Sequence, residues 1–570
     1  MIVLEGVYYS FCAISIFYGN KRSPALRMTN FLRLPMEIAN FPNLSLQKEV
    51  LNRRQCENLL DNFRKGMQAI ATFANGLDGN VFRRVEEDML LVVNKARGVI
   101  EECCDDDWCR VVMKQMNNKE TFRELLEDFE CSFYTMCNVF CQIFPSREAE
   151  ILKIESSTTF FPTCIDEVEE DRDSMCERFT KHLKMCKNAC CKDCTLVRYL
   201  MGRVKGLQRA EGGELDSIIF PHDYPCPEYG RPRVPLGGGA SGSVYPTKWL
   251  GFDTVTKVIE VKGPEVEAMV WKEASILGGL NHPNIIKLFC CGRTRDLPNI
   301  ELFSCGLLQG KEKKLFEIVT ERGNMDLLCF LNGHTSFNEG NAIDVMMQIA
   351  SGMCYLHDME VAHRDLKPEN VVLTLNDPTS VEHVHAKLVD FGISKIEVTN
   401  SSKVPTNGYR YGTCGYMAPE VLEKSSKVDA FKTDVFSFGM MCSEILSKKK
   451  NFDGFPLHGY ENFILNGERP ELPQACSEGV KSLIHKCWSQ EPSRRPTFLD
   501  IHKTLRKLKS DGILETFHDV VAPKQSNEPT FQPGLKFGNT TSSSRIEEQS
   551  ESTLSDQMRP EVNTTLSIFI

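Results

Sequence analysis

The stretch from Val361 to Asn370, Val-Ala-His-Arg-Asp-Leu-Lys-Pro-Glu-Asn, constrains the fold of this chain more than any other. Asp365 stands five residues before the amide of Asn370, and a second acid, Asp390, follows a short apolar strand 20 residues later. Two carboxylates and an amide supply hard oxygen ligands for a cation such as Mg²⁺, and a carboxylate can also accept a proton. The fold must therefore bring together two segments that are separated in the sequence.

A glycine-rich segment, Leu236-Gly237-Gly238-Gly239-Ala240-Ser241-Gly242-Ser243-Val244-Tyr245, precedes these residues in the chain. The Gly-x-Gly-x-x-Gly core by itself is a weak signal, because a dinucleotide-binding fold uses the same spacing to open a helix. Here the glycines run into residues that favour strands, such as Val244, Tyr245 and Val255. We expect a hairpin tip whose backbone N–H groups can approach nucleotide phosphates closely.

A lysine, Lys257, lies within the next strand pattern, Thr254-Val255-Thr256-Lys257. We expect its side chain to point across the glycine hairpin towards phosphate, with Glu273 of the following helix as its counter-ion when no nucleotide is bound. Two alternatives stay open at this point. Lys257 could be an exposed strand lysine, or a shift of register could put Lys262 in its place.

Taken in order, these segments resemble the motif set of eukaryotic protein kinases, from about Tyr229 to Leu508. The ending Cys487-Trp488 through Arg495-Pro496-Thr497-Phe498 is similar to the tyrosine-kinase-like group of serine/threonine kinases. The resemblance implies an α+β, bilobal kinase fold that uses ATP and Mg²⁺ and acts on protein substrates. The family usually has alanine two positions before the strand lysine, so the bulkier Val255 and its neighbour Thr256 are expected to narrow the adenine pocket.

The same resemblance assigns roles to single residues. Asp365 would accept or orient the proton of the substrate hydroxyl, Lys367 would contact the transferring phosphate, and Asn370 with Asp390 would hold Mg²⁺. Thr413 is expected to shape the substrate pocket. Lys367 in this motif is typical of serine/threonine kinases, and activity on tyrosine stays open. The ATP-binding residues would be Gly237, Gly239, Gly242, Val244, Lys257, Glu273, Thr320 and Glu321.

The segment from Asp390 to Glu420 resembles the activation segment of kinases. In the family, an arginine directly before the catalytic acid, here Arg364, pairs with a phosphate on this segment and orders it. At the far end of the segment, Glu420 is expected to pair with Arg495 inside the lobe. We hypothesise that activity is switched by phosphorylation at Ser401, Ser402 or Thr406.

Helical spacing of apolar residues dominates from about Leu44 to Leu207, as in Phe122, Leu125, Leu126 and Phe129. We expect an all-α bundle of four or five helices that contains no catalytic constellation. The run Asn52-Arg53-Arg54-Gln55-Cys56 opens a long amphipathic helix ahead of the kinase-like region. This arrangement resembles the helical domain of plant mixed-lineage-kinase-domain-like proteins.

Shifts in composition divide the chain into five segments. The apolar run Ile2–Tyr18 carries Glu5 and lacks a preceding basic stretch, so we favour an extension, with translation starting at Met28 or Met36, over a signal or anchor. The predicted segments are an uncertain extension (1–35), the helical bundle (36–210), a Gly- and Pro-rich linker (211–229), the kinase domain (230–508) and a disordered tail (509–570).

Composition limits the partners and the compartment. The net charge of −10 argues against a protein built to coat nucleic acid. The 24 cysteines lack the spacing of a disulfide framework, which indicates a reducing, cytoplasmic compartment. Cys186, Cys190 and Cys194 lie four residues apart, on one face of a helix, which favours a buried thiol stripe over a zinc site.

Two functions are compatible with these patterns. In the first, which we favour, the protein is a kinase that transfers the γ-phosphate of ATP to Ser or Thr in intracellular signalling. In the second, the kinase fold is a weakly active or inactive switch for the helical bundle, which would self-associate or contact a membrane in cell-death or immune signalling. The intact trio of Asp365, Asn370 and Asp390 favours the enzyme, because a pure switch has no need to keep all three.

Overall fold

The structure is a computed structural model. Of the 26 helices and strands given below, seven helices precede the kinase-like region and the other 19 elements belong to it. The structure describes residues 41–42, 44, 50–74, 79–105, 107–115, 118–185, 192–208, 227–230, 234–239, 242–293, 314–333, 337–375, 384–392, 395–396, 412–425, 428–452 and 457–521. The predicted extension (1–35) and the tail beyond residue 521 lie outside these residues.

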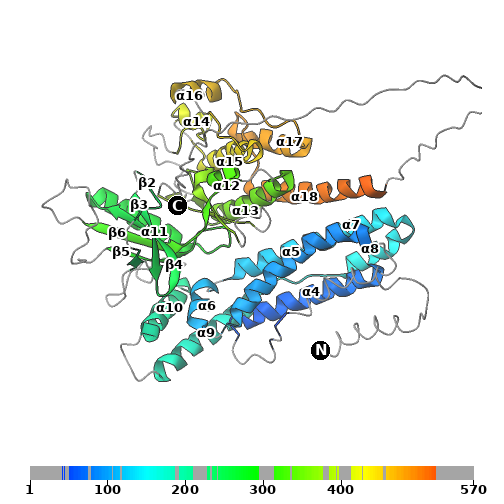
Figure 1. Ribbon diagram of the computed structural model, residues 1–570, viewed down its shortest axis with the longest axis horizontal. Helices are drawn as coiled ribbons and strands as arrows, with labels where there is room; N and C mark the ends of the chain where they lie inside the picture. The colour runs from blue at the N-terminus through cyan, green and yellow to red at the C-terminus, as the bar shows by residue number, and fades with distance from the viewer. Residues whose placement is uncertain are drawn as a thin grey trace, which may run out of the picture.

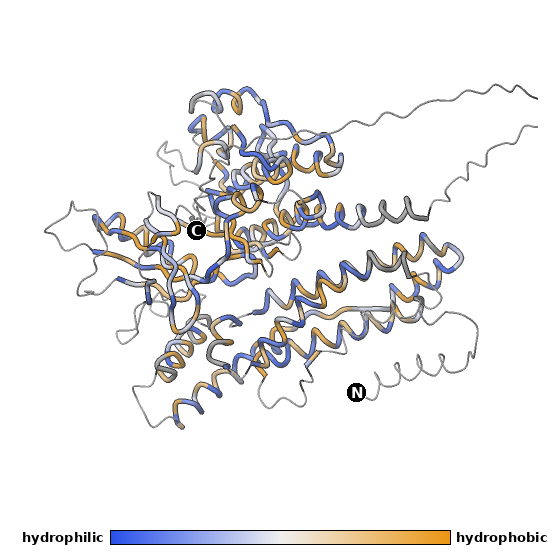
Figure 2. Tube along the Cα trace, viewed as in Figure 1, coloured by the Kyte–Doolittle hydropathy of each residue, from blue (hydrophilic) through white to orange (hydrophobic). Residues whose placement is uncertain are grey.

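A helical bundle forms the N-terminal part (Figure 1). Its stripes of apolar residues are buried as the spacing predicts, and Phe63 of the first long helix stacks on Phe129 with ring centroids 4.1 Å apart. Apolar and polar residues alternate along these helices in Figure 2. The helices are α4 (Arg53–Ala74), α5 (Gly79–Cys103), α6 (Trp108–Gln115), α7 (Lys119–Ile143), α8 (Glu148–Ser157), α9 (Ile165–Met185) and α10 (Lys192–Gln208).

The described part of this bundle contains seven helices, so the expectation of four or five was wrong. The additional helices include α6 with 8 residues and α8 with 10 residues. Helices of this length make only two or three turns, which is too few for a repeating apolar stripe to stand out in the sequence. No helix among the described residues is both long enough and apolar enough to cross a membrane.

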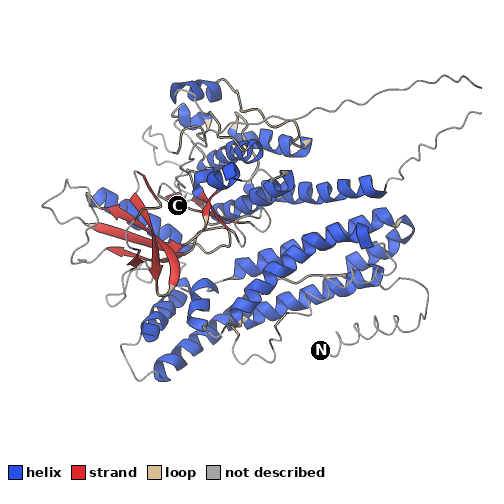
Figure 3. Cartoon of the chain, viewed as in Figure 1, coloured by secondary structure: helices blue, strands red, loops and turns tan. Residues whose placement is uncertain are grey.

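A six-stranded antiparallel sheet follows, shown in red in Figure 3. Its order is β1-β3-β4-β6-β5, with β2 paired to β3. One helix, α11 (Pro264–Gly279), connects β4 to β5 and carries Glu273. The strands are β1 (Glu228–Tyr229), β2 (Gly237–Gly239), β3 (Gly242–Trp249), β4 (Phe252–Glu260), β5 (Leu288–Arg293) and β6 (Leu315–Glu321).

A mainly helical lobe completes the fold and confirms the predicted α+β, bilobal arrangement preceded by helices. Two short sheets, β10-β9-β7 and β11-β8, belong to this lobe. Its elements are β7 (Met325–Asp326), α12 (Leu327–Gly333), α13 (Glu339–Asp358), β8 (Val361–Ala362), β9 (Val371–Thr374), β10 (His385–Leu388), β11 (Lys395–Ile396), α14 (Pro419–Leu422), α15 (Ala430–Ser447), α16 (Leu457–Leu465), α17 (Glu478–Cys487) and α18 (Phe498–Val521).

The bundle covers the edge of the six-stranded sheet. The edge strand β5 has a register shift between Leu288 and Cys290, which leaves carbonyl groups outside the ladder. Helix α10 satisfies them: Tyr199 Oη donates to the carbonyl oxygen of Phe289, and Arg203 Nη1 donates to those of Leu288 (2.8 Å) and Phe289 (3.1 Å). A sheet edge that would otherwise be open to pairing is thereby closed.

Apolar packing continues this contact across one face of the sheet. Trp249 stacks on Phe289 with ring centroids 6.2 Å apart, and Tyr199 packs edge-on against Trp249 at 6.0 Å. Phe252 and Val319 join the same buried cluster as Leu200 and the core of the bundle. The bundle and the sheet therefore share one hydrophobic core.

The last helix makes a second contact between the bundle and the kinase-like region. Lys509 Nζ lies 2.7 Å from Asp88 of α5 and 3.0 Å from Asp344 of α13, and the hydroxyl of Ser510 lies 2.8 Å from that of Thr135. These contacts account for a helix that continues beyond Leu508, where the sequence placed the end of the kinase domain. The spacing of apolar residues does not predict that α18 continues beyond Leu508, because the residues that stabilise this extension belong to the bundle.

We predict that Phe289→Ala lowers the free energy of unfolding by about 3–5 kcal/mol, because it leaves a cavity in the shared core. Phe289 is 3% exposed, whereas Phe161 of the bundle is 55% exposed, so Phe161→Ala is the matched control. Chemical denaturation followed by circular dichroism measures both. Equal effects of the two substitutions would contradict a shared core at Phe289.

Candidate active site

The segment Val361–Asn370 is held in place by an acid that follows it in the chain. Asp434 of α15 is fully buried and accepts hydrogen bonds from the backbone N–H groups of His363 (2.9 Å) and Arg364 (2.7 Å). Its Oδ2 also lies 3.0 Å from His357 Nε2. These bonds fix Arg364 with φ of 71°, in the left-handed region that few residues other than glycine adopt.

The loop presents three predicted residues together. Lys367 Nζ donates to Asp365 Oδ2 at 2.8 Å, and the side-chain amide of Asn370 donates to the same oxygen at 3.0 Å. Thr413 joins them from the far end of the activation segment. Its hydroxyl donates to Asp365 Oδ1 at 2.6 Å and accepts from Lys367 Nζ at 2.7 Å. Both oxygens of Asp365 are therefore oriented by neighbouring side chains.

A second cluster joins the two lobes. Lys257 of β4 donates to Glu273 of α11 at 2.7 Å and to Asp390 at 3.1 Å. Although burial opposes the charged forms, the two carboxylates raise the pKa of Lys257, and the ammonium of Lys257 lowers the pKa of Asp390. Burial raises the pKa of Glu273, and Asp390 adopts a φ of 64°. A buried lysine held between two acids is ready to exchange one of them for a phosphate.

The backbone connects the two clusters. The N–H of Val389, directly before Asp390, donates to the carbonyl oxygen of Asn370 at 3.0 Å. His363 Nε2 lies 3.1 Å from the carbonyl oxygen of Val389, and its ring lies 5.2 Å from that of Phe391. The residues predicted to hold a metal, Asn370 and Asp390, thus come from adjacent segments.

The strand lysine is Lys257 and not Lys262. Lys262 is 75% exposed, and its ammonium lies 3.8 Å from Glu260. The strand alternation also decides which neighbour of Lys257 faces the site. The hydroxyl of Thr256 lies 2.8 Å from that of Thr247, on the face that carries Phe252 towards the bundle. Of the two residues expected to narrow the pocket, therefore, Val255 shares the face of Lys257.

The glycine hairpin has the geometry that the sequence indicates. β2 and β3 pair from Gly237 opposite Val244 to Gly239 opposite Gly242. Gly242 has a φ of 134°, and a Cβ atom at this position would lie 2.6 Å from the carbonyl oxygen of Val258. Only glycine is therefore tolerated where the hairpin approaches β4. Val244 is buried and lies opposite Lys257 in the register of β3 and β4.

The predicted hinge residues end β6. Thr320 is buried and pairs with Val255 of β4. The carboxylate of Glu321 accepts from the ammonium of Lys387 (2.8 Å) and from the backbone N–H of Lys287 (2.7 Å). Because these partners engage its side chain, any contact of Glu321 with a nucleotide would come from its backbone.

The predicted regulatory residues are described only in part. Ser401, Ser402 and Thr406 lie outside the described residues, whereas Arg364 is half-buried beside the catalytic loop. The expected pair of Arg495 and Glu420 is confirmed as two parallel hydrogen bonds of 2.7 and 2.8 Å. Cys186 and Cys190 also lie outside these residues, whereas Cys194 is buried, and no metal-binding group of three or more ligands occurs within the described part of the chain.

Sequence reasoning gave no role to Asp434 and expected only a pocket-shaping role for Thr413. A signal for Asp434 is nevertheless present in the sequence: this acid directly precedes the largely apolar run Val435–Met441, on a helix that is buried almost throughout. A buried acid in such a run requires hydrogen-bond donors. Its partners lie 70 residues earlier in the chain, so the spacing alone does not identify them.

Comparison with known proteins agrees with this geometry. Residues 232–505 match the family model described as protein kinase domain. The chain contains a protein kinase domain. Protein kinase domains use ATP as the phosphate donor.

Three relatives illustrate the similarity. A light-sensor protein kinase of Ceratodon purpureus is 26% identical over 512 residues, covering 80% of this chain and 36% of the relative. The serine/threonine-protein kinase VIK of Arabidopsis thaliana is 32% identical, covering 48% and 59%. Mitogen-activated protein kinase kinase kinase 7 of Bos taurus is 30% identical, covering 48% and 42%. The chain thus spans between about a third and three fifths of these relatives' lengths.

We predict that Asp434→Asn destabilises the kinase domain by about 1–3 kcal/mol. The two oxygens of Asp434 accept one hydrogen bond each from backbone N–H groups, and in asparagine one of these oxygens is replaced by an NH₂ group, which cannot accept. Thermal or chemical unfolding measures the loss. Asp358→Asn, which alters an exposed acid at the end of α13, is the matched control. Equal stability of the two variants would show that the bonds of Asp434 contribute little.

Proposed function

We propose that this protein is a serine/threonine kinase of the tyrosine-kinase-like group, which transfers the γ-phosphate of ATP to protein hydroxyls in signalling. The observation that carries the proposal is the contact of Asp365 with both Lys367 and Thr413 (2.8 and 2.6 Å), beside the triad of Lys257, Glu273 and Asp390. The relatives named serine/threonine-protein kinase support the substrate class.

The residues present are suited to Mg²⁺. Asp390 is ionised beside Lys257, and Asn370 is joined to the Asp390 segment by the bond from Val389 N–H. Carboxylate and amide oxygens are the ligands that Mg²⁺ prefers. Asn370 and Asp390 would hold the ion, which when bound neutralises charge on the phosphates of ATP.

The remaining residues would act on the reacting atoms. Asp365 orients the substrate hydroxyl and accepts its proton as the new bond from oxygen to the γ-phosphorus forms and the bond to the leaving ADP oxygen breaks. Lys367, 2.8 Å from Asp365, supplies positive charge to the transferred phosphoryl group. Lys257 holds the phosphates of ATP, and the glycine hairpin between Gly237 and Val244 covers them.

The boundaries of the functional units remain part of the proposal. We assign residues 36–210 to the bundle, 211–229 to a linker and 230–508 to the kinase domain, with α18 continuing beyond that boundary to Val521. Regulation by phosphate at Ser401, Ser402 or Thr406, read by Arg364, belongs to the same proposal.

The alternative function, a switch that controls a self-associating or membrane-acting bundle like that of plant mixed-lineage-kinase-domain-like proteins, has less support. A switch needs only to bind nucleotide. It does not require an acid whose two oxygens are both oriented, as those of Asp365 are by Lys367 and Thr413.

We expect Asp365→Asn to lower phosphate transfer by about 10²- to 10⁴-fold, because the amide cannot accept the proton of the hydroxyl. The assay follows labelled phosphate from Mg²⁺-ATP into a general protein substrate and into the full-length chain itself. Asp358→Asn, an exposed acid seven residues earlier, serves as the control. Equal incorporation by Asp365→Asn and wild type, or none by wild type, would refute the enzymatic proposal.

A second prediction concerns Thr413. Thr413→Val removes the hydroxyl that bridges Asp365 and Lys367, so we expect kcat to fall about tenfold or more while the KM for ATP stays unchanged. Thr413→Ser keeps the hydroxyl and should retain most of the activity. Similar kcat values for the valine and serine variants would show that the bridge is not needed for the reaction.

A further inference from the structure

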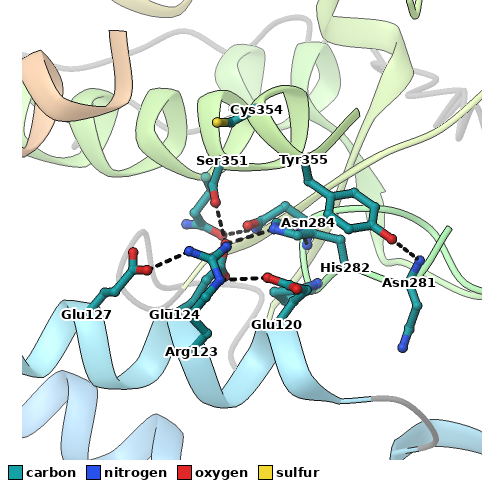
Figure 4. A network of polar contacts seen from close by, with 12 residues as sticks. Glu120, Arg123, Glu124, Glu127, Asn281, His282, Asn284, Ser351, Cys354 and Tyr355 are labelled. Carbon is teal, nitrogen blue, oxygen red and sulfur yellow. Dashed lines mark hydrogen bonds and ion pairs between the residues drawn. The ribbon is translucent and has the colours of Figure 1, made fainter. Parts of the chain in front are cut away.

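The bundle contacts the kinase domain at one more place, and this contact is polar. Figure 4 shows helix α7 of the bundle facing the segment between α11 and β5, here named the α11–β5 loop (residues 280–287), and helix α13. Glu124 of α7 points between them. Its Oε1 lies 3.0 Å from Nε2 of His282, and it accepts a hydrogen bond from the hydroxyl of Ser351.

The carboxylate of Glu124 is ionised within this contact. Burial opposes its charge, but His282, Ser351 and Arg123 lower its pKa to about 2. The side chain of His282 is fully buried, and its Nδ1 accepts from the backbone N–H of Asn284 at 3.1 Å. That bond places the imidazole proton on Nε2, towards Glu124. The contact lies within ion-pair distance but lacks the alignment of a hydrogen bond, so the charge of Glu124 acts on the buried imidazole electrostatically, in a desolvated setting where such attraction is weakly screened.

The α11–β5 loop is also fastened on its other side. Asn281 N–H donates to Tyr355 Oη of α13 at 3.1 Å, and the ring of His282 lies 4.9 Å from that of Tyr355. Asn284 donates to the carbonyl oxygen of Ala386 at 2.9 Å. The loop is thus held between the helical lobe and the bundle, and Glu124 provides the bundle's charged contact.

This loop directly continues α11. The helix ends at Gly279, six residues after Glu273, which corresponds to about 9 Å along a rigid helix. Glu273 in turn holds Lys257 at 2.7 Å. A displacement of the loop would therefore move the end of α11 and with it the carboxylate that orients the phosphate-binding lysine.

We propose that Glu124 is a positioning residue for the nucleotide site: from the helical bundle, it fixes the α11–β5 loop through His282, and so holds α11 where Glu273 can pair with Lys257. The bundle then sets the affinity of the kinase domain for ATP. The inference rests on the proposed function to the extent that Lys257 binds the phosphates of ATP, but it does not require phosphate transfer.

The test measures binding of a fluorescent ATP analogue to full-length variants in the presence of Mg²⁺. We expect Glu124→Ala to weaken binding about fivefold or more, in the range of energetic coupling between distant sites. Glu124→Gln keeps the size of the side chain and an acceptor for the hydroxyl of Ser351, and should restore part of the affinity. Glu120→Ala is the matched control, since Glu120 lies one turn earlier on α7 and bonds to Arg123 of the same helix.

A double substitution distinguishes positioning from general stability. If Glu124 acts through Lys257, the loss caused by Glu124→Ala should disappear in a Lys257→Met background, because the two effects are not additive. An equal loss in both backgrounds would overturn the proposal. So would unchanged affinity of Glu124→Ala, or equal losses in Glu124→Ala and Glu120→Ala.

Two further measurements keep the result interpretable. Thermal unfolding shows whether Glu124→Ala is folded at the assay temperature. If it is not, Ser351→Ala, which removes one partner of Glu124 and leaves its charge, should weaken ATP binding about twofold or more, and an unchanged affinity would count against the proposal. Failure of the proposed function appears differently, as absent phosphate transfer in wild type with nucleotide binding still sensitive to Glu124.

Discussion

Burial of the edge and one face of the six-stranded sheet is the interaction on which the rest of this structure depends. Trp249, Phe252 and Phe289 would expose large apolar surfaces without the bundle, and the carbonyl groups of the β5 bulge would lack the donors of Tyr199 and Arg203. Because apolar burial is the main favourable term in folding, the helices and the sheet form one cooperative core. The bundle is thereby part of the frame that supports the nucleotide site.

The opposite face of the same sheet carries the charged chemistry. Strand alternation sends Phe252 and Thr256 towards the bundle and Val255 and Lys257 towards α11. A one-residue slip of β4 would exchange these faces, placing a lysine in the apolar core and a phenylalanine on the face of the nucleotide site. The packing of the bundle against the sheet and the position of Lys257 therefore depend on the same register.

Three further groups of buried polar contacts complete the frame. Asp434 holds the catalytic loop, Glu124 holds the α11–β5 loop, and Lys509 joins α18 to both α5 and α13. Each joins segments far apart in the chain, and each buries a charge with its partners. Such pairs add little net stability, but they allow few alternative arrangements, because a buried charge without its partner is costly. Their main effect is therefore to fix the geometry of the site, and their contribution to the stability of the fold is small.

Local patterns in the sequence were sufficient to predict much of the fold and of the candidate site. The acids Asp365 and Asp390, the glycine hairpin and the helical stripes of the bundle were predicted, because each depends on residue type and short spacing. The short helices α6 and α8, the extension of α18 beyond Leu508 and the orientation of Thr256 were not predicted. Their reasons lie in contacts with distant segments, which no local period records.

The sequence by itself determined that this chain has a kinase domain behind a set of helices, since the types and order of the catalytic residues are a property of the chain alone. Only the tertiary structure decided that the helices close the edge of the kinase sheet and bring Glu124 to His282. The physical reason is that an amphipathic helix specifies that it must bury a face, but not which surface will cover it.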